Sequence, residues 1–296
     1  MDRIERAVGV DLPIRVLAAE TTDLVEHARK VHETLPTATA ALGRVLTGTA
    51  LFGAILKGKE DEVTVQISGS GPVGTLLATA DAKGNVRGYI QNPQVHLELN
   101  SKGKLDVGGA VGTDGFLNVI KDLGVGQGYQ SKVPLVTGEI GDDFTYYFTQ
   151  SEQVPSAVGL GVLVERDGSV GKAGGFLLQL MPGADEATVT KAEEMVARVP
   201  SVTGFYTSGG TAKTMIETFF GSDVQFKWLE SLPVTYTCSC SRERLAKALV
   251  SLGAEELNSL AADENGAELV CRFCWSKYHF TPEELRELAK SAGGGR

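Results

Sequence analysis

Cysteine is scarce in this chain and is absent from its first 237 residues. Only four cysteines occur among 296 residues, and all four lie between positions 238 and 274. Disulfides are typical of secreted proteins and rare in the cytosol. The sparse use of cysteine therefore favours a cytoplasmic protein, and it raises the question of what the clustered cysteines do.

An excess of positive charge is also missing. The chain has 28 Lys and Arg against 37 Asp and Glu, which gives a net charge of −9. Proteins that bind the phosphate backbone of nucleic acids usually carry a basic excess, so nucleic acid is not expected as the main partner. The N-terminal "MDRIERAVGVDLPIRV" carries charges throughout and lacks the apolar stretch of a signal peptide.

Long hydrophobic runs are absent, with one exception that needs testing. Residues 37–56, "TATAALGRVLTGTALFGAIL", contain one charge, Arg44. A membrane span needs about 20 apolar residues, and a central arginine costs roughly 2.5–3.5 kcal/mol on insertion scales. The threonines and glycines lower the hydrophobicity further. We therefore predict a buried central helix that follows Pro36 and ends near Gly58, and no membrane association.

Motifs typical of enzymes are lacking as well. "GSGPVG" at 69–74 has the glycine spacing of a dinucleotide-binding loop, but it runs into another turn instead of opening a helix. Asp142 and Asp143 are candidate catalytic residues, but a solvated turn is favoured for both. The histidines have no metal-ligand spacing, and they are His27, His32, His96 and His279. The sequence accordingly predicts a protein that is not an enzyme.

The N-terminal part of the chain, residues 1–181, shows an α+β pattern. "EVTVQIS" alternates apolar and polar positions as a half-buried strand does, and "TLLATADAKGNVRGYI" reads as two strands around a turn. The stretch from "FTYYFTQSEQ" to "GGFLLQL" is expected to add further strands. We predict an N-terminal mixed sheet and helix domain with the central helix buried against its sheets.

A segment rich in aromatic residues follows, and we predict that residues 182–232 form a helical linker. Residues 185–200 have helical spacing, and 205–228 hold six of the chain's twenty aromatic residues beside "TSGGT". Exposed together, these side chains would form a large apolar patch, so we expect folded elements to cover them at least partly. They are candidate client-binding residues, namely Phe205, Tyr206, Phe219, Phe220, Phe226 and Trp228.

The small C-terminal domain, 233–296, is predicted to bind zinc. Cys238 and Cys240 form one close pair, and Cys271 and Cys274 form a second. C-x-x-C points two thiolates at one tetrahedral zinc ion, and another close pair supplies the remaining ligands. We therefore expect one zinc per chain. Nearby cations are expected to offset the charge of four thiolates, and they are Arg242, Arg244, Arg272 and Lys277.

The spacing leaves the role of this zinc open. An inert structural module is the commonest use of four such cysteines, and a redox switch is the alternative. A nucleic-acid-binding zinc ribbon is disfavoured because residues 233–296 hold eight Lys and Arg against nine Asp and Glu. A dithiol oxidoreductase is disfavoured because no thioredoxin-like βαβ pattern surrounds the cysteines. At the C-terminus, Thr281, Pro282 and Glu284 predict the capped start of a helix.

The order of sequence blocks adds a resemblance. "CSCSRERLAKALVSLGAEEL", "VCRFCWSKYHFTPEEL", "GSGPVGTLLATADAKGNVRGYIQNP" and "GDDFTYYFTQSEQVPSAVGLGVLV" resemble blocks of the 33-kilodalton heat-shock protein family of redox-regulated chaperones. The likeness extends over nearly the whole chain. It departs from the family at 203–222, where the usual linker is more acidic and more regularly helical.

The resemblance implies an ATP-independent holdase that is inactive when reduced and zinc-bound. Oxidation would pair Cys238 with Cys240 and Cys271 with Cys274, release zinc and unfold the C-terminal domain with the adjoining linker. Unfolding client proteins are the implied partners, and a homodimer is a candidate for the active form. The alternative is an inert structural zinc module that acts as a binding domain.

Overall fold

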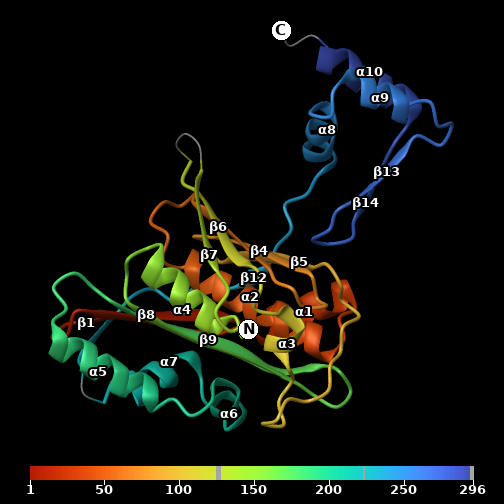
Figure 1. Cartoon of the computed structure of the whole chain (residues 1–296). Helices are drawn as coiled ribbons and strands as arrows, with labels where there is room; N and C mark the ends of the chain where they lie inside the picture. The colour runs from red at the N-terminus through yellow and green to blue at the C-terminus, as the bar shows by residue number, and fades with distance from the viewer. Residues whose placement is uncertain (125–127, 223, 294–296) are drawn as a thin grey trace. The chain divides into compact units, whose positions relative to one another are not determined.

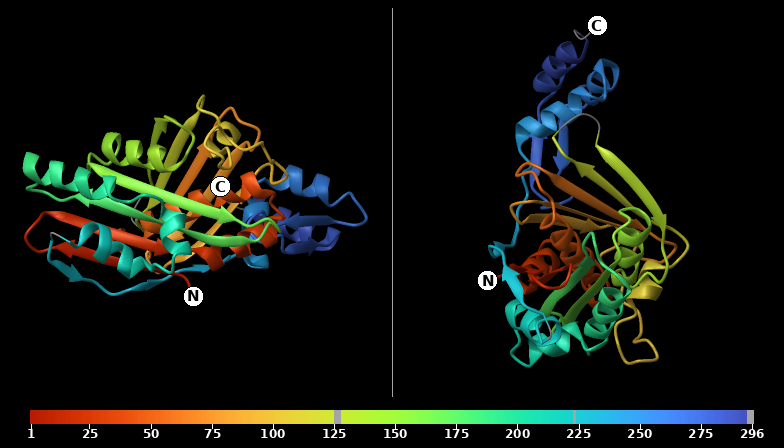
Figure 2. Two further views of the ribbon diagram at one scale, coloured as in Figure 1. Left: turned by 90° about the horizontal axis from the view of Figure 1, so that it is seen from below. Right: turned by 90° about the vertical axis from the view of Figure 1, so that its left-hand side faces the viewer.

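The computed structural model describes residues 1–124, 128–222 and 224–293. The chain forms two compact units, Met1–Thr237 and Cys238–Arg296, which Figures 1 and 2 show coloured along the chain. Residues 182–232 pack within the first unit. Their role as a linker stays a prediction.

Two six-stranded sheets form the first unit. One sheet has the order β10-β1-β2-β9-β8, and β11 also pairs with β1. Its pairings are all antiparallel. Its strands are β1 (Arg3–Gly9), β2 (Ile14–Glu20), β8 (Ser156–Val164), β9 (Val170–Leu180), β10 (Phe226–Trp228) and β11 (Leu232–Pro233).

The second sheet has the order β12-β5-β4-β3-β6-β7. Its strands are β3 (Glu62–Ser68), β4 (Thr75–Asp81), β5 (Asn85–Ile90), β6 (Phe116–Asp122), β7 (Tyr129–Pro134) and β12 (Thr235–Tyr236). In β3 the apolar residues Val63, Val65 and Ile67 are fully buried, while the polar residues between them are half-buried. This alternation and the turn between β4 and β5 confirm the strands predicted from the sequence.

A buried helix lies between the two sheets. α2 (Pro36–Gly53) packs against strands of both sheets and beside α1 (Thr22–His32). Its threonines are tolerated because Thr47 and Thr49 donate hydrogen bonds to the carbonyls one turn earlier, at 2.8 and 2.7 Å. The predicted central helix is thus confirmed, although it ends at Gly53 and not near Gly58. No helix in the described ranges is long and apolar enough to cross a membrane.

One predicted strand is a helix instead. Residues of "DDFTYYFTQ" form α4 (Gly141–Gln150), although the sequence led us to expect a β-rich run here. Phe144, Tyr147 and Phe148 recur at helical spacing, and all three are buried in the core. The aromatic residues suggested a strand, but their three- and four-residue spacing suits one face of a helix.

Asp143 explains why this helix begins where it does. The expectation of a solvated turn was wrong for this residue, because its side chain is fully buried. Its carboxylate accepts backbone N–H groups from Val136 at 2.7 Å, Thr137 at 3.2 Å and Ile140 at 2.9 Å. Asp143 therefore organises the loop that enters α4. It makes no contact that indicates catalysis.

We expect Asp143→Ala to lower the free energy of unfolding by roughly 2–4 kcal/mol, because several buried N–H groups would lose their charged acceptor. Urea unfolding followed by far-ultraviolet circular dichroism measures this change. Asp142→Ala is the matched control, since Asp142 is exposed and should change stability by less than about 0.5 kcal/mol. Equal effects of the two substitutions would contradict this role.

A layer of short helices covers the other face of the first sheet. Alternate residues of β2 face the two cores: Leu17 and Ala19 face α2, whereas Val16 and Ala18 face this outer layer. The predicted helix at 185–200 is confirmed, and it is followed by short, irregular turns. The layer consists of α5 (Glu186–Ala197), α6 (Val202–Thr207), α7 (Ala212–Met215) and a π-helix, η1 (Ile216–Phe220).

The second unit has a small core of its own. Its helices and hairpin bury residues that include Leu257, Phe280 and Leu285. The predicted capping box is confirmed, because the Thr281 N–H donates to Glu284 at 2.8 Å and the Glu284 N–H donates to Thr281 Oγ1 at 3.3 Å. The elements are α8 (Arg242–Val250), α9 (Ala254–Leu260), β13 (Ala267–Val270), β14 (Lys277–Phe280) and α10 (Pro282–Gly293).

Candidate metal centre

The four cysteine sulfurs converge at one end of the second unit. Cys238 and Cys240 lie in the extended segment before α8, while Cys271 and Cys274 lie in the turn between β13 and β14. The four Sγ atoms all lie within 4.8 Å of one another. The Sγ atoms of Cys238 and Cys271 are 3.7 Å apart, and those of Cys240 and Cys274 are 3.3 Å apart. Residues distant in sequence thus form one cluster.

Local backbone geometry holds the second pair in place. The Trp275 N–H donates to the Cys271 carbonyl at 2.8 Å, and the Cys271 N–H donates to the Ser276 carbonyl at 2.9 Å. Trp275 has φ of 58°, in the left-handed region, which closes this turn tightly. Cys271 is buried, whereas the other three cysteines are half-buried. The turn between β13 and β14 therefore presents both thiols on the same side.

Hydroxyl groups contact two of the sulfurs. The Tyr278 hydroxyl lies 3.2 Å from Cys240 Sγ, and the Ser276 hydroxyl lies 3.2 Å from Cys274 Sγ. Sequence analysis missed both residues. The signal that could have found them is their spacing, because residues two and four places after Cys274 lie close to it at the start of the returning strand. Such outer contacts orient the ligands of a metal site and tune their basicity.

The surroundings separate the acidities of the thiols. Burial raises the pKa of Cys238 and of Cys271. At Cys274 burial also raises the pKa, but hydrogen bonds with the hydroxyl and backbone of Ser276 and with the Cys240 and Cys238 thiols together outweigh it and lower the pKa to about 7. The hydrogen bond with Cys240 is the main cause that raises the pKa of Tyr278 to about 12. Cys274 is therefore the readiest of these three thiols to ionise in the metal-free protein.

The cations expected beside the cysteines also contact other residues. Arg242 Nη2 donates to both carboxylate oxygens of Glu284, at 2.6 and 2.7 Å, and the guanidinium lies over the ring of Phe280. Arg244 donates to the Ser239 carbonyl at 3.0 Å. Lys277 pairs with Glu268 at 3.1 Å. These contacts brace the segments that carry the cysteines, and the compensation of thiolate charge stays a prediction.

The cluster fits a tetrahedral, thiolate-binding metal ion. A tetrahedral S4 site with metal–sulfur bonds of about 2.3 Å has sulfur–sulfur edges of about 3.8 Å. The separations of 3.3 and 3.7 Å, and the upper limit of 4.8 Å, are close to that value. Four thiolates select soft or borderline metals such as zinc over calcium and magnesium, which prefer oxygen ligands.

The histidines are placed elsewhere and form no such cluster. His32 is buried with Nε2 2.9 Å from the Gly88 carbonyl, and His27 stacks on Tyr236. His96 bonds to Thr37, and His279 bonds to the Asn265 carbonyl. Across the described residues, the four cysteines are the one group of three or more His, Cys, Asp or Glu side chains placed to share a metal ion.

The predicted client-binding aromatics lie in the first unit, in the outer core. Tyr206 and Phe220 are buried, and the Tyr206 hydroxyl donates to the Ala19 carbonyl at 2.8 Å. Phe205, Phe219 and Phe226 are partly buried in the same cluster. Trp228, which is 36% exposed, lies beside Lys213. Folded elements thus cover this segment at least in part, as expected, but none of these contacts tests client binding.

The fold and the cysteine cluster together define a class: an α+β protein with a small C-terminal four-cysteine module. Known proteins of this class are similar to this chain in sequence. The profile of the family described as "Hsp33 protein" matches residues 2–281. A "33 kDa chaperonin" of Geobacillus sp. (strain WCH70) is 48% identical over 291 residues, which cover 98% of each chain. One from Bacillus subtilis (strain 168) is 47% identical over 288 residues, which cover 97% of this chain and 98% of that one.

A solved structure shows the same fold. The crystal structure of the 33 kDa chaperonin (heat shock protein 33 homolog) from Thermotoga maritima matches with a TM-score of 0.87 and 37% identity, and the match covers 99% of each chain. The chain belongs to the Hsp33 family of chaperones. The resemblance noted in the sequence is thereby confirmed.

Proposed function

We propose that this protein is a redox-controlled, ATP-independent holdase of the cytoplasm that binds unfolding proteins after oxidation. The observation that carries the proposal is the single cluster of four sulfurs within 4.8 Å, in a chain of the Hsp33 family. Cys238, Cys240, Cys271 and Cys274 would hold one zinc ion in the reduced state. The bound ion would tie the segment before α8 to the hairpin of β13 and β14, and so stabilise the second unit.

Oxidation would convert the ligands into two local disulfides. Cys238 and Cys240 together give two electrons to one hydrogen peroxide molecule, which takes up two protons and becomes two waters, while one S–S bond forms. Cys271 and Cys274 react in the same way with a second peroxide. The four sulfurs then offer no thiolate ligands, and their hold on the metal is lost.

The energetics favour unfolding after this reaction. Structural zinc contributes on the order of 10–16 kcal/mol to folding. In the loop-entropy model, each of these two short disulfides restores only roughly 1.5–2 kcal/mol, because the loops that they close are tiny. The small core around Leu257 and Phe280 would have to supply the stabilising free energy that zinc provided and the disulfides do not replace. A unit of this size seldom does so.

Client binding would use apolar surface that becomes accessible when the C-terminal unit and the linker open. The candidate residues are the six aromatics of 205–228 and the sheet face beneath them, which includes Val16 and Phe176. A homodimer is the candidate active form. No nucleotide is required, because binding to apolar surface needs no chemical step.

The second candidate is an inert structural metal module, and one observation favours it. The second unit buries six residues in a core of its own: Leu249, Leu257, Ala261, Phe280, Leu285 and Ala289. If this core holds the unit together without metal, oxidation would change little outside the cluster. The protein would then act through a constant binding surface.

One experiment separates the two candidates. Reduced protein should contain one zinc per chain by elemental analysis. Peroxide-treated protein should release it and suppress light scattering by thermally unfolding citrate synthase without ATP, whereas the reduced protein should not. Equal suppression by both forms would favour the inert module. Strict dependence on nucleotide hydrolysis, or no zinc in carefully reduced protein, would contradict the proposed function.

A further inference from the structure

The first sheet ends in an edge strand, β8. β8 pairs with β9 on one side only and is the last strand in its sheet. It is nine residues long, "SAVGLGVLV", and has no charged or proline residue. Folded proteins usually protect such edges with charges, prolines, bulges or short strands, because unpaired backbone groups attract another strand. This strand has no charge and no proline and is not short, and its one irregularity, between Leu163 and Val164, lies at its far end.

The direction of the unpaired groups follows from the ladder. The Pro155 carbonyl accepts from the Leu180 N–H on β9. The backbone N–H and C=O groups of odd-numbered residues of β8 therefore point toward β9. The backbone groups of even-numbered residues point away from β9. Among them, the Val158 N–H donates to the Thr145 hydroxyl at 3.0 Å. In the described part of the chain, the N–H and C=O groups of Leu160 and Val162 have no such partner. Four backbone groups therefore point outward unpaired.

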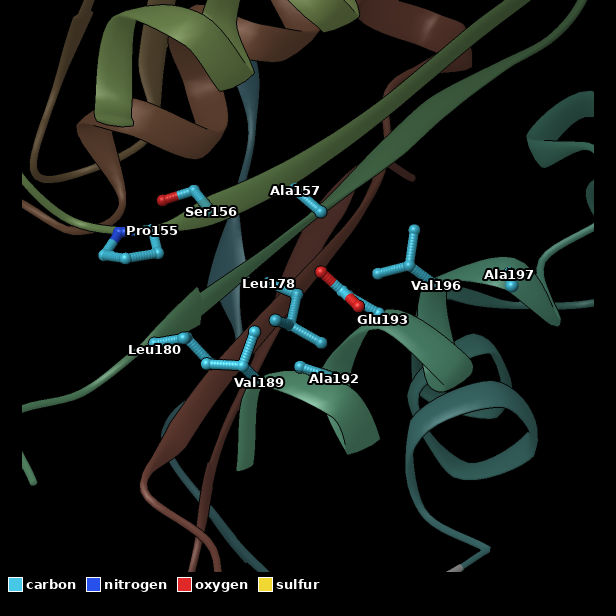
Figure 3. Close-up of a pocket in the computed structure, with 10 residues that line it drawn as sticks. All are labelled: Pro155, Ser156, Ala157, Leu178, Leu180, Val189, Ala192, Glu193, Val196 and Ala197. Atoms are coloured by element: carbon cyan, nitrogen blue, oxygen red, sulfur yellow. The ribbon is translucent and has the colours of Figure 1, made fainter. Parts of the chain in front are cut away.

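Two cavities lie along this part of β8. A cavity of about 480 Å³ runs along Leu160–Val164, between the 99–105 loop and the start of α6. A second cavity, of about 420 Å³, continues along Val158–Leu160 and shares Arg44, Lys104 and Leu105 with the first. On the opposite side of the strand's beginning, an apolar cavity of about 330 Å³ lies between β8, β9 and α5, where Val189, Ala192 and Val196 approach the strands (Figure 3).

The charges around the groove indicate what it would accept. The larger cavity is lined by Arg44 and Lys104 and by no acidic residue, in a chain whose net charge is −9. The second cavity adds Lys102 but also two acidic residues, Asp142 and Glu139, of which Glu139 pairs with Arg44. No ion pair of Lys102 or Lys104 exists among the described residues. Arg44 pairs with Glu139, yet its buried Nε lacks a hydrogen-bond partner within the described structure. An occupant with an acidic side chain or a free carbonyl would complement these donors.

We propose that β8 binds an extended segment of a client polypeptide as an additional strand, with apolar side chains in the flanking cavities and an acidic residue near Lys102 and Lys104. The partner would be recognised mainly by its backbone, through hydrogen bonds to Leu160 and Val162. This mode tolerates many sequences, because every extended chain presents the same backbone groups. The inference rests on the proposed holdase function: the start of α6 lines the groove in the folded protein and belongs to the segment expected to open on oxidation, so clients would reach the whole edge only in the oxidised protein.

Proline at position 162 tests the edge directly. Val162→Pro removes one outward N–H and breaks no bond to β9, and the preceding Gly161 adapts readily to a following proline. Val162→Ala is the matched control, since it shortens the side chain but keeps the N–H. We expect oxidised Val162→Pro to bind unfolded citrate synthase about three- to tenfold more weakly than Val162→Ala, the effect of one lost hydrogen bond.

Hydrogen exchange on the unaltered protein gives a second readout that does not depend on the variant folding. Binding of unfolded citrate synthase should slow exchange at the Leu160 and Val162 amides and leave Gly161 and Leu163, which face β9, unchanged. Equal affinities of the two variants, or unchanged exchange at Leu160 and Val162, would overturn the inference while the holdase function stands. Protection of these amides that rises with protein concentration in the absence of client would assign the edge to a second copy, and so would also overturn it. An unaltered oxidised protein that suppresses no aggregation would refute the holdase function itself.

Discussion

Cys271→Ser should remove the stoichiometric metal and leave the second unit unfolded under reducing conditions. Cys271 is the buried member of the cluster, and its N–H and carbonyl hold the turn that carries Cys274. A serine hydroxyl is a poor replacement for a thiolate ligand, so most of the roughly 10–16 kcal/mol of a structural zinc site would be lost. The first unit should keep its thermal transition, because its cores do not use this cluster.

Elemental analysis and amide exchange over residues 238–292 measure this effect. Arg272→Ala is the matched control, since Arg272 is the exposed neighbour in the same turn and should leave metal content near one per chain. If Cys271→Ser lost the metal but kept slow exchange in α9 and α10, the core around Leu257 and Leu285 would be sufficient for folding. The inert module would then be the better description.

Peroxide should also open the aromatic segment 205–228 together with the second unit. The chain that joins them runs through three strands of only two or three residues, β10, β11 and β12, which pair with β1 and β5. Strand pairings this short are stabilised by only a few hydrogen bonds, so they separate easily. Before them lie the π-helix η1 and the turn at Gly209, whose φ is 92°. Irregular elements of this kind give an outer layer that opens more readily than the central sheets.

Hydrogen exchange after peroxide treatment measures the extent of opening. Amides of 205–222, 224–228 and 238–290 should lose protection together by orders of magnitude, whereas those of α2 should stay slow because nearly all of that helix is buried. This opening is opposed by the packing of three buried side chains, Tyr206, Met215 and Phe220, against the sheet. If exchange in 205–222 and 224–228 stays slow after zinc release, these aromatics are constant core residues, and clients must bind elsewhere.

Local spacing was enough to predict the parts of the structure that local interactions stabilise. The alternation in "EVTVQIS" predicted β3, the apolar run after Pro36 predicted α2, and Thr281 with Glu284 predicted the start of α10. The two cysteine pairs predicted a shared metal site, and the sulfurs do converge. Each of these features depends on residues that are close in sequence or on a chemistry that few residue types can provide.

Other features depend on partners that are distant in sequence, and only the tertiary structure decided them. Aromatic content favoured a strand at 144–150, but burial against α2 and capping by Asp143 made it a helix. The contact of Tyr278 with Cys240 required the hairpin to fold back on the segment before α8.

The edge position of β8 could not be read from its composition, because an apolar strand in the middle of a sheet looks the same. By itself the sequence determined the clustered cysteines that are candidate metal ligands and the helix between the sheets, since these follow from residue type and period. The tertiary structure decided which strand remained unpaired and which aromatics were covered, because both depend on the order in which distant segments pack.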